Sequence, residues 1–312
     1  VLSIISPQNG GTFIDCTFGQ GGYTEKILEF PKTKVIAFDR DSKSKNIAIK
    51  FKQKFKNRFD FYNKKFSDID SIKLPKTING IIFDLGFSYN QIKDESKGLS
   101  FNHSGQLNMK MGCNKISADD IIKKLSAKDL EKIFKYFGDE KNSKIIAKKI
   151  AKERKNKNID TEGLVKLINL SKKNFTKKNK ATKIFQALRI LVNEEISELI
   201  HALSKSCNLI SDGGIIITIS FHSIEDKICK FFFNTISTHK AVSRYMPINK
   251  NDELAFDLIN KKAITPTKEE LEINFPSRSA KLRAVKKNKK KEIDKKFLFR
   301  KFENLLNIEK LS

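Results

Sequence analysis

Three glycines follow an acidic residue near the N-terminus, in the run Asp15-Cys-Thr-Phe-Gly19-Gln-Gly21-Gly22. The residues from Thr12 onward are β-formers, and the residues from 24 to 30 have a helical pattern. Glycines at a strand-to-helix turn let the backbone approach a nucleotide-like ligand at the carboxyl end of the strand. An ordinary surface turn can carry the same glycines, so the run alone leaves both interpretations open.

A second acid strengthens the interpretation as a nucleotide-cofactor site. Asp39 closes the next predicted strand, at 34–39, where a carboxylate can accept hydrogen bonds from ribose hydroxyls. Nicotinamide and methyl-donor cofactors share this geometry. Two features favour S-adenosylmethionine. Asp15 stands just before the glycines, where it could meet the positively charged amino-acid end of that cofactor. In addition, Gly22 directly follows Gly21, a spacing that departs from the dinucleotide fingerprint.

These residues require an α/β scaffold. Strands are predicted at 12–16, 34–39, 59–63 and 78–84, with a helix at 42–56. The nearly continuous apolar runs are typical of strands covered on both faces, and the alternation predicts a doubly wound parallel sheet.

The alternation stops between about Ser117 and Ala202. Helices are expected at 139–155, 161–170 and 181–204, and Ser117 and Ser126 are candidate N-caps. A strand returns at 214–221. The simplest architecture is a helical domain inserted into an α/β domain. The predicted boundaries are 1–112 and 204–285 for the two parts of the α/β domain, 113–203 for the insert and 286–312 for a basic tail.

The charge of the chain indicates which kind of molecule it binds. The 312 residues carry 62 Lys and Arg against 36 Asp and Glu, a net charge of +26, which favours a polyanion such as nucleic acid. A lysine-rich codon bias is the alternative.

Cys16, Cys113, Cys207 and Cys229 lack metal-ligand spacing, so no metal is expected. Neither an apolar run of roughly 18 residues nor a signal peptide is found, so a cytoplasmic protein without a membrane span is expected. The chain starts at Val1, which suggests a missing N-terminal segment.

Several segments, in order along nearly the whole chain, resemble the RsmH (MraW) family of small-subunit ribosomal RNA cytosine-N4 methyltransferases. The first is Asp84-Leu-Gly-Phe-Ser88 with Gln91 and Asp94. The others are 98–101, 107–111, 136–140, 181–190 with Asn193, 219–226 and 278–283.

The resemblance implies a class I methyltransferase fold with an inserted helical domain. It also implies methyl transfer from S-adenosylmethionine to the exocyclic amine of a cytidine in 16S ribosomal RNA, in the decoding region. The partner would be this RNA or the assembled small subunit. Carried over by position, the cofactor contacts fall on Gly21, Gly22, Tyr23, Asp39, Phe66, Asp84 and Gln91.

The chain departs from the family pattern at several of these positions. Tyr23 replaces a usual His, Ser88-Tyr-Asn-Gln91 replaces Ser-Ser-Pro-Gln, and Asn108 and Gly112 replace two Asp residues around Met109. A noncatalytic ribosome-binding relative, or an amino-methyltransferase of DNA or small molecules, therefore remains as an alternative.

Acceptors that hold the N–H bonds of a cytosine amine would favour its reactive form and take its proton. Asp84 and Asn108 are the candidate catalytic residues, and a purely cofactor-holding Asp84 is the alternative. His222 is interpreted as a hydrogen-bonded histidine at a strand end rather than as a base. Arg189, Arg278 and Arg283 are candidates for phosphate contacts, with a salt bridge between the domains as the alternative for Arg189.

Overall fold

The computed structural model describes residues 1–88, 91–92, 94–101, 105–112, 114–171, 180–238, 254–288 and 296–311. The chain forms two compact units: Val1–Gly86 with Glu198–Arg300, and Phe87–Ser197 with Lys301–Ser312. Within the described residues, no helix has both the length and the apolar character needed to cross a membrane.

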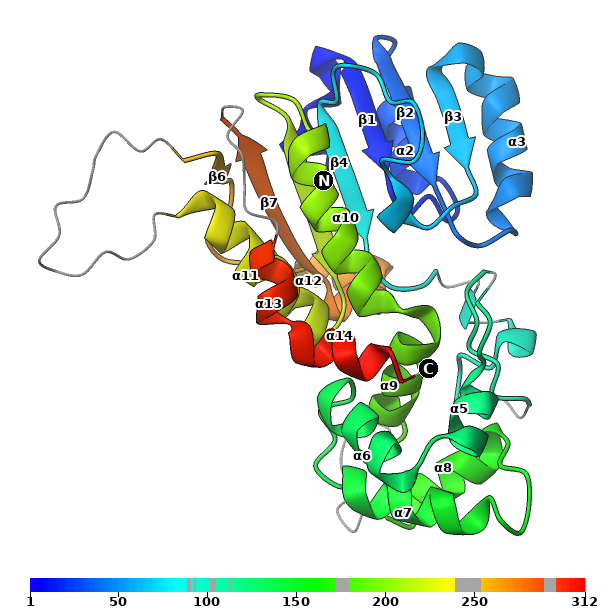
Figure 1. The fold of residues 1–312 in the computed structure, drawn as a ribbon. Helices are drawn as coiled ribbons and strands as arrows, with labels where there is room; N and C mark the ends of the chain where they lie inside the picture. Colours follow the sequence, from blue (N-terminus) through cyan, green and yellow to red (C-terminus); the bar gives the residue numbers. More distant parts are fainter. Residues whose placement is uncertain are drawn as a thin grey trace, which may run out of the picture. The chain divides into compact units, whose positions relative to one another are not determined.

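The first unit is built on a seven-stranded sheet with the order β3-β2-β1-β4-β5-β7-β6 (Figure 1). Five strands are parallel and two, β7 and β6, are antiparallel to their neighbours. The strands are β1 Gly11–Asp15, β2 Thr33–Phe38, β3 Phe59–Tyr62, β4 Gly80–Asp84, β5 Ile215–Ser220, β6 Phe256–Leu258 and β7 Lys281–Lys287. The predicted doubly wound sheet is confirmed.

The apolar runs predicted as strands are buried because each strand contributes to both faces of the sheet. One face packs against α1 (Leu2–Ile5), α2 (Gly22–Leu28) and α3 (Ser44–Phe55). The strand residues of this face include Phe13, Val35, Ala37, Ile82 and Ile217. The sheet order reverses between β1 and β4, and in open α/β sheets ligands bind outside the carboxyl ends of strands at such a switch point.

Further helices of the first unit are α11 (Ser223–Ser237), α12 (Lys268–Ile273) and α13 (Lys296–Lys301), together with α10 (Glu195–Leu209), whose first turn belongs to the second unit. Short 3-10 turns include η3 (Phe66–Asp68) and η5 (Phe275–Ser279).

The regular elements of the second unit, within its described part, are helices. It contains α5 (Ala118–Lys124), α6 (Ala127–Tyr136), α7 (Ser143–Glu153), α8 (Thr161–Asn169), α9 (Thr182–Asn193) and α14 (Glu303–Glu309). The predicted N-caps are confirmed: Ser117 forms a capping box with Asp120, and Ser126 accepts the Asp129 N–H.

The two compact units divide the chain at other residues than the predicted domain boundaries, which stay a prediction. The second unit starts at Phe87 rather than 113 and ends at Ser197 rather than 203. The helix expected at 181–204 is two helices, because Glu194 has φ 51° and ends α9. The helix expected at 139–155 begins only at Ser143, after Asp139 with φ 49°.

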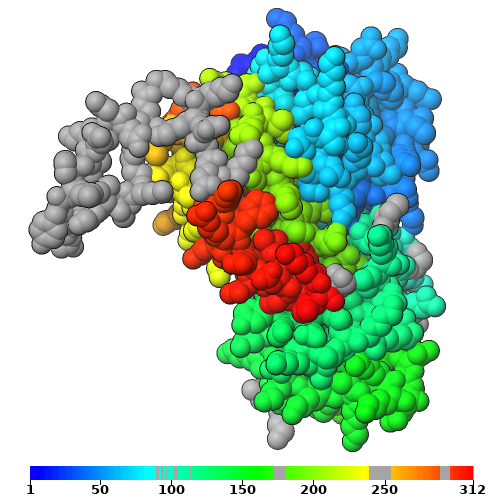
Figure 2. Space-filling model, in the orientation of Figure 1, coloured from blue at the N-terminus to red at the C-terminus, as the bar shows by residue number. Residues whose placement is uncertain are grey.

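The predicted basic tail from 286 contains regular structure in its described part. Lys286 and Lys287 end β7, and the chain from Lys296 onward forms α13 and α14, while the lysines at 289–291 lie outside the described residues. The outer side of α14 is exposed, in red in Figure 2, and the helix packs on α6. Sequence periodicity does not reveal this docking, because α14 is short and its partner is distant in sequence.

Glu309 explains how α14 is held. Its carboxylate accepts the N–H groups of Ile196 at 2.9 Å and Ser197 at 2.8 Å, at the first turn of α10. These amides have no partner inside their own helix, so Glu309 acts as an N-cap supplied from the C-terminus. Burial raises the pKa of Glu309 to about 7.

Glu309→Ala is therefore expected to lower the free energy of unfolding by about 1–3 kcal/mol, because two buried N–H groups lose their acceptor. Asn307→Ala, on the exposed side of the same helix, is the control and should change stability by less than about 0.5 kcal/mol. Denaturant unfolding of both variants checks this, and equal stabilities would contradict the capping role.

Candidate functional site

The glycine turn after β1 is fixed by a buried acid. Asp15 accepts the Thr24 hydroxyl at 2.7 Å and the Thr17 N–H at 3.1 Å, one on each carboxylate oxygen. These bonds tie the turn to the first residues of α2. Desolvation by burial, opposed by these hydrogen bonds, raises the pKa of Asp15 to about 6. Asp15 therefore shapes the turn, and its charge acts on neighbouring groups.

The last two glycines of the turn differ in the space around their Cα atoms. Gly21 has φ +81°, and a Cβ there would lie 2.5 Å from the Phe51 ring. A Cβ on Gly22 would meet no heavy atom within 4 Å. Gly21 is thus required by the packing of the turn, whereas the backbone at Gly22 borders open space. This is the backbone exposure that a cofactor lying across the turn needs.

Asp39 joins the end of β2 to the same turn. Its Oδ2 accepts the Gly19 N–H at 2.7 Å and the Ser44 hydroxyl at 2.8 Å, and its Oδ1 accepts the Asp41 N–H at 2.7 Å. A carboxylate offers about four acceptor positions, so Oδ1 retains one for a ligand hydroxyl. Burial raises the pKa of Asp39. The geometry fits the predicted ribose contact.

Glu198 braces the neighbouring strand ends. This residue of α10 is 3% exposed and accepts hydrogen bonds from the Arg40 guanidinium at 2.5 Å and the Phe66 N–H at 3.2 Å. Phe66 begins η3, with its ring edge-on to Phe83 at 5.6 Å between centroids. Sequence reasoning missed Glu198. The available signal was an acid between the apolar positions Ile196 and Leu199 of a predicted helix.

Asp84 ends β4 with a buried oxygen that has no protein partner. Its Oδ1 lacks a hydrogen bond within the described part of the chain. Tyr23, half-buried at the start of α2, hydrogen-bonds the same carboxyl group. The backbone N–H of Asp84 donates to the Thr17 hydroxyl at 2.8 Å. Leaving a buried acceptor unsatisfied costs on the order of 1–3 kcal/mol, so this oxygen is suited to a donor from outside the chain.

The surroundings of Asp84 also determine the pKa of its carboxyl group. Burial raises its pKa to about 7, the negative charges of Asp15 and Glu225 add to this effect, and the Tyr23 hydrogen bond opposes it. A carboxyl group with a pKa near neutrality can accept a hydrogen bond and then a proton at physiological pH. Its site favours a positively charged or proton-donating ligand.

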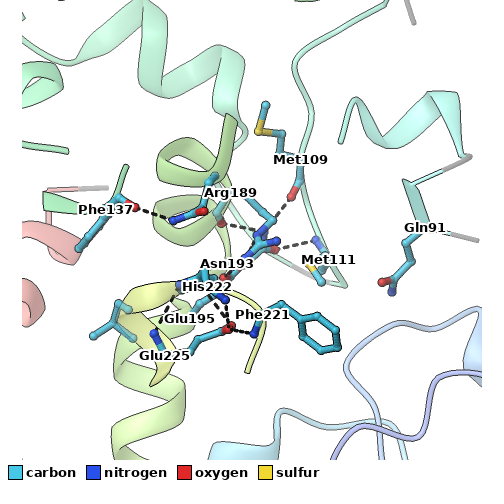
Figure 3. Close-up of polar contacts among 12 residues, drawn as sticks. Gln91, Met109, Met111, Phe137, Arg189, Asn193, Glu195, Phe221, His222 and Glu225 are labelled. Atoms are coloured by element: carbon cyan, nitrogen blue, oxygen red, sulfur yellow. Dashed lines mark hydrogen bonds and ion pairs between the residues drawn. The ribbon is translucent and has the colours of Figure 1, made fainter. Parts of the chain in front are cut away.

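His222 has a structural role at the end of β5. It is the N-cap of α11, and its Nδ1 accepts the Glu225 N–H at 3.4 Å, while Glu225 Oε2 accepts the N–H groups of Phe221 at 3.0 Å and His222 at 3.3 Å (Figure 3). The predicted hydrogen-bonded histidine at a strand end is confirmed.

The remaining two predicted site residues belong to the second unit. Gln91 accepts the Ser88 N–H at 2.9 Å through its side-chain oxygen, and the Asn108 carbonyl accepts the Ala118 N–H at 3.1 Å. The other six, Gly21, Gly22, Tyr23, Asp39, Phe66 and Asp84, lie in the first unit.

The segment around Asn108 is clamped by a buried amide. Asn193, at 0% exposure, donates to the Met109 carbonyl at 2.9 Å and accepts the Met111 N–H at 2.8 Å (Figure 3). Met109 has φ 56°, in the left-handed region that costs a branched or bulky residue free energy. The clamp holds this conformation and so fixes the backbone at Asn108.

The three arginines singled out in the sequence have partners within their own units. Arg189 pairs with Glu195 at 2.8 Å and lies over the Phe87 ring at 4.6 Å. Arg283 pairs with Asp226 at 2.8 Å, and the Arg278 guanidinium lies over the Phe275 ring at 4.7 Å. Arg189 and Arg283 are thus held in buried ion pairs in the free protein, and their phosphate contacts stay a prediction. For Arg189 the pair is formed inside the second unit rather than between domains. Cys16, Cys207 and Cys229 are buried and form no disulfide within the described residues, and Cys113 lies outside them.

A parallel sheet with an antiparallel β7, a glycine turn after β1 and acids after β2 and β4 defines a class I S-adenosylmethionine-dependent methyltransferase. The sequence model of the MraW methylase family matches residues 1–288, and the chain belongs to this family. The family predicted from the sequence is confirmed.

Named relatives agree. The chain is 39% identical over 295 residues to a protein of Ehrlichia ruminantium called ribosomal RNA small subunit methyltransferase H, covering 92% of this chain and 96% of the relative. It is 38% identical over 300 residues to the protein of that name from Orientia tsutsugamushi, covering 92% and 95%. An rRNA methylase structure from Streptococcus thermophilus aligns with a TM-score of 0.42 at 10% identity, over 92% and 95% of the two chains.

Asp84→Asn should stabilise the free protein, and more so at high pH. Because the folded-state pKa of Asp84 is raised to about 7 from 3.8, the folded state binds this proton more tightly than the unfolded state. The contribution of Asp84 to stability therefore falls as the pH rises from about 4 to about 7. An uncharged amide escapes this loss, so the gain should be larger at about pH 8 than at about pH 4, by roughly 1–3 kcal/mol.

Urea unfolding at the two pH values checks the expected gain. Asp212→Asn, at an exposed position, is the control and should show no such pH-dependent difference. A gain for Asp84→Asn that is independent of pH would mean that Asp84 is not buried as a near-neutral acid.

Proposed function

We propose that the chain methylates the exocyclic N4 amine of a cytidine in 16S ribosomal RNA, in the decoding region of the small subunit, with S-adenosylmethionine as the methyl donor. The observation that carries the proposal is the buried Asp84 oxygen at the carboxyl end of β4, which has no hydrogen-bond partner among the described residues. Family membership supports the reaction type, and the names of the relatives support the RNA. We place the reaction in the cytoplasm.

The first unit offers a set of groups that fit the cofactor. Its backbone is open at Gly22, the Asp39 carboxylate has one acceptor position left, and the Phe66 ring follows β3 at a point braced by Glu198. We assign ribose binding to Asp39, packing on the adenine to Phe66, and backbone contact to Gly21 and Gly22. When bound, S-adenosylmethionine supplies an electrophilic methyl group.

Asp84 would then act on the target amine. The lone pair of this amine is delocalised into the cytosine ring, so the amine is a poor nucleophile. An acceptor that holds one N–H bond favours the pyramidal, reactive geometry, and a carboxylate with a pKa near 7 can take the proton as the new N–C bond forms. The Tyr23 hydroxyl, which is bonded to the carboxyl group, orients it. The roles of Asn108 as a catalytic acceptor and of Gln91 as a cofactor contact, both residues of the second unit, stay predictions.

The decisive test of the function is incubation of the protein with undermethylated small subunits and labelled S-adenosylmethionine, followed by mapping of the label. Label on the N4 atom of one decoding-region cytidine is expected. Cofactor binding without any transfer would favour a noncatalytic ribosome-binding relative. Labelling of DNA or free nucleosides, but not of subunits, would favour the other alternative.

Asp39→Asn should weaken S-adenosylmethionine binding by about 10- to 100-fold, because it removes a charge-assisted acceptor for the ribose. The amide keeps an oxygen that can accept the Gly19 N–H, so this variant is more conservative than Asp39→Ala. Asp60→Asn on β3 is the control, because Asp60 pairs with Lys34 and Lys52 at the surface. Calorimetry of the folded variants measures the affinities, and unchanged binding by Asp39→Asn would remove Asp39 from the cofactor site.

A further inference from the structure

One helix of the second unit carries a row of exposed lysines. In α7 the side chains of Lys144, Lys148 and Lys152 are exposed, whereas Ile146 and Ile150 on the opposite side are buried. The three lysines are spaced four residues apart and so lie on one face of the helix. With a rise of about 1.5 Å per residue, they extend over about 12 Å. We call Lys144, Lys148 and Lys152 the α7 lysine row.

The charge of the α7 lysine row is not compensated by acids. Some lysines elsewhere in the second unit pair with an acid one turn away, namely Lys123 with Asp119, Lys132 with Asp129 and Lys166 with Glu162. No ion pair joins the α7 lysine row to any acid among the residues that the structure describes. The nearest acid along α7, Glu153, pairs with Lys157 instead.

The arrangement has a cost in helix stability. Each lysine of the row has another lysine of the row as its neighbour four residues away, and like charges at this spacing destabilise a helix by about 0.2–0.5 kcal/mol per pair. Two such pairs lie on α7. A polyanion bound along this face would attract the three lysines and offset the repulsion between them.

Contacts with other parts of the second unit hold α7, and with it the lysine row, in place. α7 packs against α6 and α8 (Figure 1). At its end, Arg154 donates from Nη1 to the carbonyls of Ile122 at 2.5 Å and Leu125 at 2.6 Å. Lys149, next to the row, donates to the Leu170 carbonyl at 2.8 Å. The three charges therefore stand on a fixed helix rather than on a loose segment.

We propose that the α7 lysine row binds the sugar-phosphate backbone of the RNA substrate, an inference that rests on the proposed function. In double-stranded DNA one strand carries a phosphate for about every 3.4 Å of helix axis, so a row of about 12 Å matches a length of duplex that holds three or four phosphates of one strand. Lysines act as point charges without reading bases, and such contacts position a nucleic acid rather than specify its sequence. The net charge of +26 adds long-range attraction for the same partner.

The test compares two triple variants. One is Lys144→Gln, Lys148→Gln and Lys152→Gln. The control is Lys45→Gln, Lys50→Gln and Lys73→Gln, three exposed lysines of the first unit without a described ion pair. Both lose three charges, so an effect of net charge alone would be equal in the two proteins. Binding to undermethylated small subunits is measured across a salt titration, and cofactor affinity by calorimetry.

The row variant should bind the subunits about 10- to 100-fold more weakly. The slope of log K against log salt should become shallower by about 2, because the variant no longer releases the counterions that the three lysines displace from the RNA. The control variant should keep nearly the wild-type slope, and both should keep wild-type cofactor affinity. Equal slopes in the two variants would overturn the proposal. If the wild-type protein binds subunits but transfers no label, the proposed reaction fails while the slopes still decide on the α7 lysine row.

Discussion

The carboxyl groups of Asp15, which is buried, and of Asp39 and Asp84, which are half-buried, stand at the ends of three adjacent strands. The first unit must supply hydrogen-bond donors to these acids. Burial raises the pKa of all three. A buried carboxylate is tolerated only when donors surround it. The turn after β1 and the starts of α2 and α3 supply those donors to Asp15 and Asp39 through backbone and hydroxyl groups.

Asp84 differs from the other two acids in what it lacks. Asp15 has a donor on each oxygen, whereas one oxygen of Asp84 has no partner in the part of the chain that the structure describes. The charge of Asp15 also acts on Asp84 and favours its protonated form. The same edge of the sheet thus contains two acids that hold the backbone and one acid, Asp84, that we propose as the acceptor of the target amine. This separation follows from the distribution of donors rather than from the residue type.

Much of this edge could be predicted from the sequence because its signals are local. The glycine run, the acids after apolar strands, and the Ser117 and Ser126 caps each depend on residues within one or two turns of each other. Glu198 and Glu309 could not be recognised in this way, because their partners lie more than 100 residues away. The break at Glu194 was missed because periodicity continues across it, although its φ of 51° ends the helix.

Single-turnover methylation of undermethylated small subunits by Asp84→Asn, at saturating S-adenosylmethionine, tests the central claim most directly. If the free oxygen of Asp84 accepts the target amine, the rate should stay about 10²- to 10⁴-fold below wild type even when cofactor binding is saturated. A rate that recovers fully at saturation would contradict the account and leave Asp84 as a residue that only binds the cofactor.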